Sequence, residues 1–288
     1  MIERTIKVLH LEPTDVCQAS CALCARETDP YFNKDQKHHL NMDTILKVFS
    51  TDHIAALDKM FMCGNYGDPA AGRHTLNIYK EFRKINPTIV LGMNTNGGLQ
   101  NTTWWQNLGK VFNQSQDYVV FSIDGLEDTN AVYRTGVDWH RVMTNVKAFI
   151  DAGGSAHWDM LVYQHNQHQV DECQRLAKEL GFRWFRAKVS KRGFTKLLQA
   201  PVGWNQPILN SNLISCHALN EQSVYIDACG RMSPCCWLGA TQKDFVTNFK
   251  QIQESWIGLD PNAVCVQTCG SKFGITNFAN QWQREVEL

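Results

Sequence analysis

Six short apolar segments alternate with amphipathic helical segments over the first two thirds of this 288-residue chain. Residues 118–123 are almost all apolar, which is typical of a strand buried on both faces of a sheet. Residues 74–86 carry apolar side chains at three-residue steps, which predicts a helix. This alternation favours an α/β fold with a parallel sheet. The expected strands are residues 6–11, 57–63, 89–93, 118–123, 156–163 and 183–189, and the expected helices are residues 43–50, 74–86, 104–112, 139–152 and 169–180.

The first predicted strand runs directly into a loop with three cysteines in eight residues, Cys17, Cys21 and Cys24. A loop this short can place three thiolates around one corner of an iron–sulfur cubane, which usually takes four cysteine ligands. One iron would then keep an open position for a substrate or cofactor, as open catalytic zinc sites do. Half of a zinc site and disulfides are the alternatives. Zinc sites usually use C-x2-4-C pairs, and the chain has an odd total of 11 cysteines with no signal peptide before them.

Glycine-rich or polar turns follow the next three predicted strands. Residues 64–69 read Gly-Asn-Tyr-Gly-Asp-Pro, in which glycine permits close backbone approach to a ligand and proline fixes the turn. Residues 94–97 read Asn-Thr-Asn-Gly, residues 122–125 read Ser-Ile-Asp-Gly, and Arg134 comes ten residues after Asp124. In β/α barrels the loops after the strands build the ligand pocket, so we expect these turns to meet there. Ordinary turn formation is the alternative.

Six of the cysteines lie between residues 216 and 269, beyond a change toward Asn, Gln and Pro near residue 203. Simple packing does not need so many thiols. Four thiolates at such spacings can hold an auxiliary iron–sulfur cluster or a tetrahedral zinc ion. The six are Cys216, Cys229, Cys235, Cys236, Cys265 and Cys269.

The Cys-x3-Cys-x2-Cys loop resembles the signature of the radical S-adenosylmethionine (radical SAM) superfamily. Residues 64–69 resemble its glycine-rich GGEP segment, with Asp68 where the family usually has the longer glutamate. Residues 94–97 look like its TNG turn, and S-x-D-G…R resembles a segment of its SPASM members. The resemblance implies that Cys17, Cys21 and Cys24 hold a 4Fe-4S cluster whose open iron binds SAM. It further implies a SAM pocket formed by Gly64, Gly67, Asp68, Pro69, Asn94, Ser122 and Arg134.

The pattern Cys216-x13-Gly230-x4-Cys235 resembles the opening of SPASM and twitch domains. There a β-hairpin presents two ligands of an auxiliary 4Fe-4S cluster, which implies this role for Cys216 and Cys235. Cys265 and Cys269 could close the cluster, and Cys236 could replace Cys235. A full SPASM domain has more cysteines, so the one-cluster twitch form fits better, with zinc as the alternative.

The resemblance implies a fold for the whole chain. Residues 1–200 are expected to form a partial (β/α)6 TIM-like radical SAM barrel. Residues 201–288 are expected to form a small twitch-like domain, with a β-hairpin and helices near 245–257 and 276–286.

Composition limits the functional classes. Lys and Arg total 28, equal to Asp and Glu, so the chain lacks the basic field of a general nucleic-acid or membrane-surface binder. No apolar run is long enough to span a membrane, and the first ten residues are not a signal peptide. We therefore expect a cytoplasmic protein with reduced thiols. Residues 183–196 carry six basic side chains and no acid, which indicates either a solvated strand end or a site for an anionic substrate.

We therefore expect a radical SAM enzyme that cleaves SAM to a 5′-deoxyadenosyl radical and removes a hydrogen atom from a substrate. By resemblance, a peptide or protein is the favoured substrate, oxidation or another modification is the expected reaction, and flavodoxin or ferredoxin is the expected electron donor. A small anionic metabolite, such as a nucleotide or sugar, is the second candidate. A non-catalytic zinc or iron–sulfur binding protein is the third. No leader-peptide domain is expected before the first strand, and the sequence identifies no catalytic acid or base.

Overall fold

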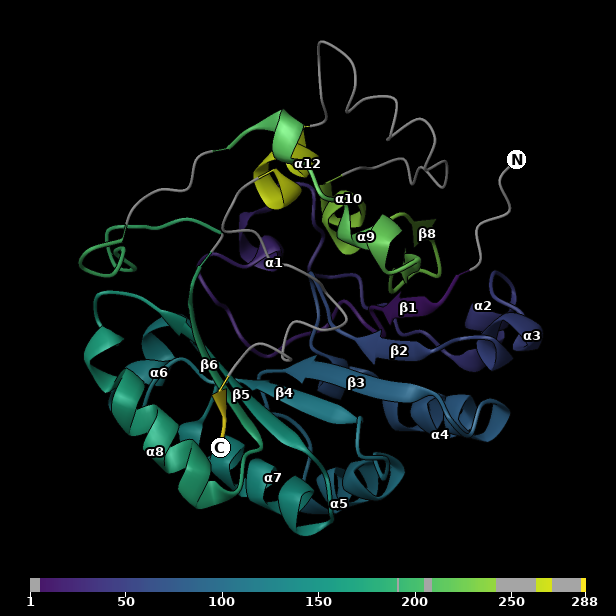
Figure 1. Ribbon diagram of the computed structural model, residues 1–288, viewed down its shortest axis with the longest axis horizontal. Helices are drawn as coiled ribbons and strands as arrows, with labels where there is room; N and C mark the ends of the chain where they lie inside the picture. The colour runs from purple at the N-terminus through teal and green to yellow at the C-terminus, as the bar shows by residue number, and fades with distance from the viewer. Residues whose placement is uncertain (1–5, 191, 205–208, 242–262, 271–285) are drawn as a thin grey trace.

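A mixed α/β fold is built on one sheet in the computed structural model, which describes residues 6–190, 192–204, 209–241, 263–270 and 286–288. All six predicted strands are present, each within a few residues of the expected bounds. Each pairs in parallel with the next one along the chain, so the predicted parallel sheet is confirmed (Figure 1). These strands are β1 (Val8–Leu11), β2 (Lys59–Met62), β3 (Val90–Thr95), β4 (Tyr118–Ser122), β5 (Ala156–Val162) and β6 (Trp184–Val189).

Three further strands extend this sheet at its two edges. They are β7 (Ser223–Ile226), β8 (Met232–Ser233) and β9 (Val286–Glu287). Among the described residues the strand order is β8-β7-β1-β2-β3-β4-β5-β6-β9, and these strands do not close into a full barrel, in agreement with the predicted partial barrel. β7 pairs in parallel with β1, whereas β8 and β9 pair antiparallel with β7 and β6.

Four predicted helices cover the outer face of the sheet (Figure 1). They are α4 (Thr75–Ile85), α5 (Thr102–Val111), α7 (Trp139–Asp151) and α8 (Val170–Leu180). Side chains alternate between the two faces of a strand, so every second residue packs under these helices. Burial of each such large side chain contributes about 1.5–3 kcal/mol. The fully or nearly buried residues of this layer include Leu9, Met60, Leu91, Val119, Trp158 and Phe185.

The alternate residues of the same strands give the inner face a different chemistry. Lys59 is buried with its Nζ 4.4 Å from the centre of the Tyr118 ring, and the His157 ring stacks on the same Tyr118 ring, with centroids 5.4 Å apart. Burial lowers the pKa of Lys59 to about 7. The polar residues on this face include Lys59, Asn94, Ser122, His157, Asp159 and Arg186.

The hairpin expected from residues 224–233 is confirmed as β7 and β8. Gly230 lies in its turn at φ +81°, a conformation that favours glycine. Its pairing with the barrel sheet was not predicted: Val8 lies beside Ser223 and Leu11 beside Ile226. The sheet is therefore continuous across the proposed domain boundary at residue 200.

The remaining helices differ in part from expectation. The helix predicted over 43–50 is two short helices, α2 (Met42–Leu46) and α3 (Thr51–Ala55), because Ser50 caps the second one through the His53 N–H. Two short helices near the cysteine loop, α1 (Ala25–Thr28) and α6 (Glu127–Tyr133), were not predicted. The region after residue 200 contains α9 (His217–Asn220), α10 (Cys236–Thr241) and α12 (Ala263–Cys269).

The helix expected at 245–257 lies outside the described residues, as does the one at 276–286 except for Val286, which belongs to β9. Within the described part of the chain, no helix has the length and apolar character needed to cross a membrane.

Candidate active site

The three-cysteine loop lies where the sequence predicted it, at the C-terminal end of β1. Cys21 is buried, and Cys17 and Cys24 are partly exposed. The Cys24 N–H donates to the Cys21 carbonyl at 2.9 Å, and the Ala19 N–H donates to Cys17 Sγ at 3.4 Å. The loop therefore folds tightly around its own thiols.

Neighbouring strands fix this loop from the side. Gln18 Nε2 donates to Asn96 Oδ1 at 2.8 Å, and Asn96 Nδ2 lies 3.6 Å from Cys17 Sγ. The Ser20 N–H donates to the Thr135 carbonyl just after α6. In the TNG-like turn, Asn96 therefore meets the cysteine loop, while Asn94 lies two residues earlier on β3.

The thiols are close enough to influence one another. Burial raises the pKa of Cys17 to about 12, and Asp68, Cys21 and Cys24 add to that rise. Burial also raises the pKa of Cys21, while the nearby Arg134 guanidinium opposes the rise. Metal-bound cysteines are thiolates, and two guanidinium groups are placed to stabilise that form: Arg134 lies near Cys21, and Arg192 lies near Cys24.

The backbone of the loop after β2 packs directly against the backbone of the segment that leads into the cysteine loop. A Cβ on Gly67 would lie 1.9 Å from the Thr14 carbonyl oxygen, and one on Gly64 would lie 2.0 Å from the Gly67 carbonyl oxygen. Both positions therefore require glycine for packing. Pro69 begins a short 3-10 helix, Pro69–Ala71, which Asp68 caps.

Asp68 is buried, and both oxygens of its carboxylate accept hydrogen bonds from protein groups. Oδ1 accepts from the Ala70 N–H at 2.9 Å and from Thr95 Oγ1 at 2.8 Å, and Oδ2 accepts from the Asn96 N–H at 2.7 Å. Asp68 thus ties the loop after β2 to the turn after β3. The predicted contact of Asp68 with SAM stays a prediction, and the hydrogen bonds that Asp68 makes in this structure hold the two loops together.

Asn94, Ser122 and Arg134 also lie at this end of the sheet. Asn94 Oδ1 is buried and has no hydrogen-bond partner among the residues that the structure describes, and Ser122 is the last residue of β4. Arg134 donates from Nε to Asp124 Oδ2 at 2.6 Å, close to Cys21. Asp124 is fully buried and also accepts from the Leu161 N–H, so it holds Arg134 in place.

Several residues of this region were not predicted as functional. Glu12 accepts from the Tyr66 and Gly67 N–H groups at 2.7 and 3.1 Å and from the Tyr225 hydroxyl. Arg192 donates to the Leu23 carbonyl at 3.4 Å. The sequence signal for Glu12 is its position directly after the first predicted strand, and the signal for Arg192 is its place in the basic segment at 183–196.

The basic segment at 183–196 divides between the two faces of β6. Arg186 and Lys188 turn to the inner face and share Asp159 of β5, with Arg186 Nε 2.9 Å and Lys188 Nζ 2.5 Å from its carboxylate. Arg183 lies on the surface beside Glu287. A solvated strand end therefore describes only part of the segment.

The second cysteine set comes together after β6 from three separate segments. Cys216 precedes α9, Cys235 precedes α10, and Cys265 and Cys269 lie one turn apart on α12. The Ser215 N–H donates to the Cys269 carbonyl at 3.1 Å. Burial raises the pKa of Cys235 to about 12, with Cys216 and Cys265 adding to the rise, so these thiols are neighbours.

The two adjacent cysteines of this set have different surroundings. Cys235 lies beside Cys216 and Cys265, whereas Cys236 is buried beside Cys63 and Glu12. In the described ranges, no group of three or more His, Cys, Asp or Glu side chains is arranged to surround a single metal ion. In a cubane, by contrast, the thiolates bind different iron atoms.

The residues of the first set fit a cluster with bound SAM. Three thiols on one short loop are the donor type that iron–sulfur clusters use. The buried, unpartnered Asn94 Oδ1 at the same end of the sheet is a hydrogen-bond acceptor that a ligand can satisfy.

Comparison with known proteins agrees with this geometry. The Radical SAM superfamily profile matches residues 11–183, which is more than half of the chain. A sequence search of curated proteins gave no match.

Solved structures share the fold at low sequence identity. Streptococcus suis SuiB bound to precursor peptide SuiA gives a TM-score of 0.60 at 14% identity, covering 88% of this chain and 65% of that one. SuiB bound to S-adenosylmethionine gives 0.60 at 15%, covering 88% and 66%. Native anSMEcpe with bound AdoMet gives 0.56 at 15%, covering 80% and 74%. This chain thus spans slightly less than two thirds of the length of SuiB.

The profile match and the parallel sheet with its cysteine loop define the class: this protein belongs to the radical SAM superfamily of enzymes. Membership implies a 4Fe-4S cluster that binds S-adenosylmethionine.

Proposed function

We propose that this enzyme cleaves S-adenosylmethionine reductively and uses the resulting 5′-deoxyadenosyl radical to remove a hydrogen atom from a peptide or protein. When bound, the cluster supplies the electron for that cleavage. The observation that carries the proposal is the arrangement of Cys17, Cys21 and Cys24 on one loop, at the end of the sheet where the buried Asn94 Oδ1 finds no donor in the described part of the chain.

The remaining residues bind and orient SAM. Arg134, held by Asp124 next to Cys21, presents its outer nitrogens to the SAM carboxylate, which suits a two-pronged bond. Ser122 and Asn94 provide polar contacts from adjacent strands. The backbone of residues 64–69, held by Asp68 and Glu12, forms the wall beside the cysteine loop.

The second cysteine set holds an auxiliary 4Fe-4S cluster in a twitch-like domain. Cys216, Cys235, Cys265 and Cys269 are its ligands, with support from the closeness of Cys235 to Cys216 and Cys265. This auxiliary cluster accepts an electron from the substrate radical, which makes the enzyme an oxidoreductase. Flavodoxin or ferredoxin reduces the first cluster. The enzyme acts in the cytoplasm. Zinc remains the alternative occupant, since four thiolates also suit that ion.

The peptide substrate is proposed from the similar fold of SuiB, solved with the peptide SuiA, and of anSMEcpe, solved with the Cp18Cys peptide. A small anionic metabolite is the second candidate. It is supported by two cationic side chains, Arg186 and Lys188, which lie beside Asp159 on the inner face of the sheet.

Anaerobic incubation with SAM and dithionite tests the proposal. The reconstituted enzyme should produce 5′-deoxyadenosine, and Cys17→Ala should produce none. A non-catalytic zinc or iron–sulfur protein would release no 5′-deoxyadenosine, and that result, or full activity of Cys17→Ala, would end the assignment.

A further inference from the structure

A chain of hydrogen bonds joins the C-terminal hairpin to the loop after β2. Tyr225 of β7 donates its hydroxyl proton to Glu12 Oε2. Glu12 Oε1 accepts from the backbone N–H groups of Tyr66 and Gly67. Glu12 is almost fully buried, so these three donors are the partners that its carboxylate has in place of water.

Asn65 makes the second half of this connection. Its Nδ2 donates to the Cys236 carbonyl at 2.9 Å and to the Tyr225 hydroxyl oxygen at 3.4 Å. The backbone carbonyl oxygen of Asn65 lies 3.6 Å from Cys24 Sγ. One residue of the loop therefore contacts both a cysteine of the first set and the segment that carries the second set.

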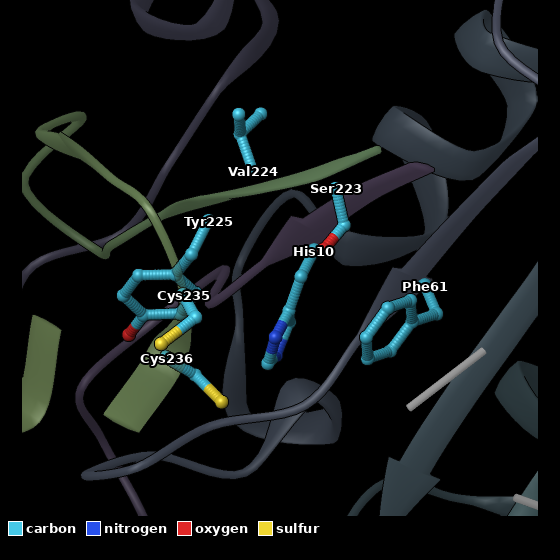
Figure 2. A pocket seen from close by; sticks show the side chains of 7 residues that line it. All are labelled: His10, Phe61, Ser223, Val224, Tyr225, Cys235 and Cys236. Atoms are coloured by element: carbon cyan, nitrogen blue, oxygen red, sulfur yellow. The ribbon is translucent and has the colours of Figure 1, made fainter. Parts of the chain in front are cut away.

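Tyr225 lies next to the second cysteine set as well. Figure 2 shows Tyr225, Cys235 and Cys236 on one side of a small pocket, with His10 and Phe61 on the other. Cys236 begins α10, directly after Cys235, so a shift of Cys235 on binding a metal moves the carbonyl that Asn65 contacts.

The loop after β2 depends on such external support. Gly64 and Gly67 provide no side chains, and their backbone fits against its neighbours without room for a Cβ. The positions of the Tyr66 and Gly67 amides are set by Glu12, and the orientation of Glu12 is set by Tyr225.

We propose that Glu12, Asn65 and Tyr225 couple the two cysteine sets, so that metal binding at the C-terminal set strengthens SAM binding at the N-terminal one. Glu12 and Asn65 act as positioning residues, because they hold the SAM-binding loop. This inference rests on the proposed SAM site and on metal binding by Cys216, Cys235, Cys265 and Cys269. Coupling between two sites is reciprocal, so SAM should equally stabilise the loaded C-terminal set.

The test compares Tyr225→Phe with Tyr79→Phe in anaerobically reconstituted full-length protein. Tyr79 is a matched control, because its buried hydroxyl donates to the Gly92 carbonyl at 2.8 Å and has no bond to Glu12 or Asn65. Calorimetry gives the Kd for SAM, and hydrogen–deuterium exchange follows the peptide covering residues 60–70.

Tyr225→Phe should weaken SAM binding about 5- to 20-fold, within the usual range of coupling between sites, and should speed exchange at residues 64–68. Tyr79→Phe should change neither. Cys235→Ala should weaken SAM binding about 5-fold in the wild-type background and add little to Tyr225→Phe, since both break one connection.

Equal SAM affinity and equal exchange for the two Tyr→Phe variants would overturn the network. Normal SAM affinity in Cys235→Ala would overturn the coupling. A wild-type protein that fails to bind SAM would instead refute the proposed function, and the exchange measurement would still decide whether Tyr225 holds the loop.

Discussion

The two cysteine sets of this protein are built in opposite ways. The first places three thiols within eight residues on one loop, which is hydrogen-bonded to the loops after β2 and β3 and to Thr135 after α6. The second draws four thiols from segments up to 53 residues apart and surrounds them with a small apolar cluster that includes Leu238 and Cys265. The first set is positioned by one short loop at the end of β1, whereas the second set forms only when segments that are distant in the sequence pack together.

This difference has a thermodynamic consequence. Closing a longer loop costs more conformational entropy, and metal binding to a site that is absent in the unfolded chain contributes directly to folding. We expect the first set to keep its shape without iron. The second set should depend on its metal for order.

The largest effect is expected at the first set. Cys17→Ala removes one of three thiolates on the loop, so the rate of 5′-deoxyadenosine formation should fall at least about 1000-fold, which corresponds to roughly 4 kcal/mol in the barrier. Product is measured by chromatography after reaction with SAM and dithionite. Cys173→Ala, in a buried thiol of α8, is the control and should retain activity.

Changes at the second set should separate metal content from SAM cleavage. Cys235→Ala should lose about half of the bound iron and still cleave saturating SAM, since the first cluster remains. Cys236→Ala should keep its iron, because Cys236 lies beside Cys63 and Glu12 instead of Cys216. Loss of iron in Cys236→Ala alone would reverse the assignment of the ligand.

The stability of the region around the first set should depend strongly on the buried ion pair between Asp124 and Arg134. Asp124→Ala leaves Arg134 without its partner in a buried site, and breaking such a pair costs about 3–5 kcal/mol. Arg231→Ala breaks an ion pair with Asp227 in which the arginine is half exposed, so it should cost at most about 1 kcal/mol. Urea unfolding of both variants compares the two regions, and equal losses would contradict the contrast.

The smallest effect is a pH dependence at the junction of the two regions. Burial raises the pKa of Glu12 to about 7, against the opposing hydrogen bonds from Tyr225, Tyr66 and Gly67. The folded protein therefore binds the proton of the Glu12 carboxyl group more tightly than the unfolded chain does. The stabilisation that this proton gives the folded state is complete below about pH 4.5 and is lost as the pH rises through 7.

Glu12→Gln should remove this loss of unfolding free energy at rising pH. Between pH 5.5 and 8, wild type should lose about 1–2 kcal/mol more unfolding free energy than the variant. Cys63, Cys236 and Tyr225 also face Glu12, but burial raises the pKa of Cys63 to about 12 and raises the pKa values of Cys236 and Tyr225 well above their usual range, so these groups keep their protons between pH 5.5 and 8. Parallel pH profiles in urea unfolding would show that Glu12 is not the group responsible.

The sequence was a good guide wherever periodicity and local motifs decide the structure. The six parallel strands, their four outer helices, the hairpin and the placement of Cys17, Cys21 and Cys24 at the end of β1 all follow from such patterns. The SAM-binding roles of Asp68 and Arg134 stay predictions, and the hydrogen bonds they make to Thr95, Asn96 and Asp124 could not be read from their spacing.

What was missed depends on contacts between distant residues. No local pattern indicates that β7 would pair with β1, because that pairing joins segments more than 200 residues apart. The role of Glu12 follows from the same pairing, since Tyr225 reaches it only when β7 lies in the sheet. The helix α6 was missed because it is only seven residues long and shows little apolar periodicity.

Iron and sulfide content after anaerobic reconstitution tests the central claim that the two sets hold two separate clusters. Wild type should contain about eight irons, and a Cys17/Cys21/Cys24→Ala variant about four, because each cubane has four. Wild type near four irons with the variant near zero would contradict the account, and would leave the second set as a zinc site or without metal.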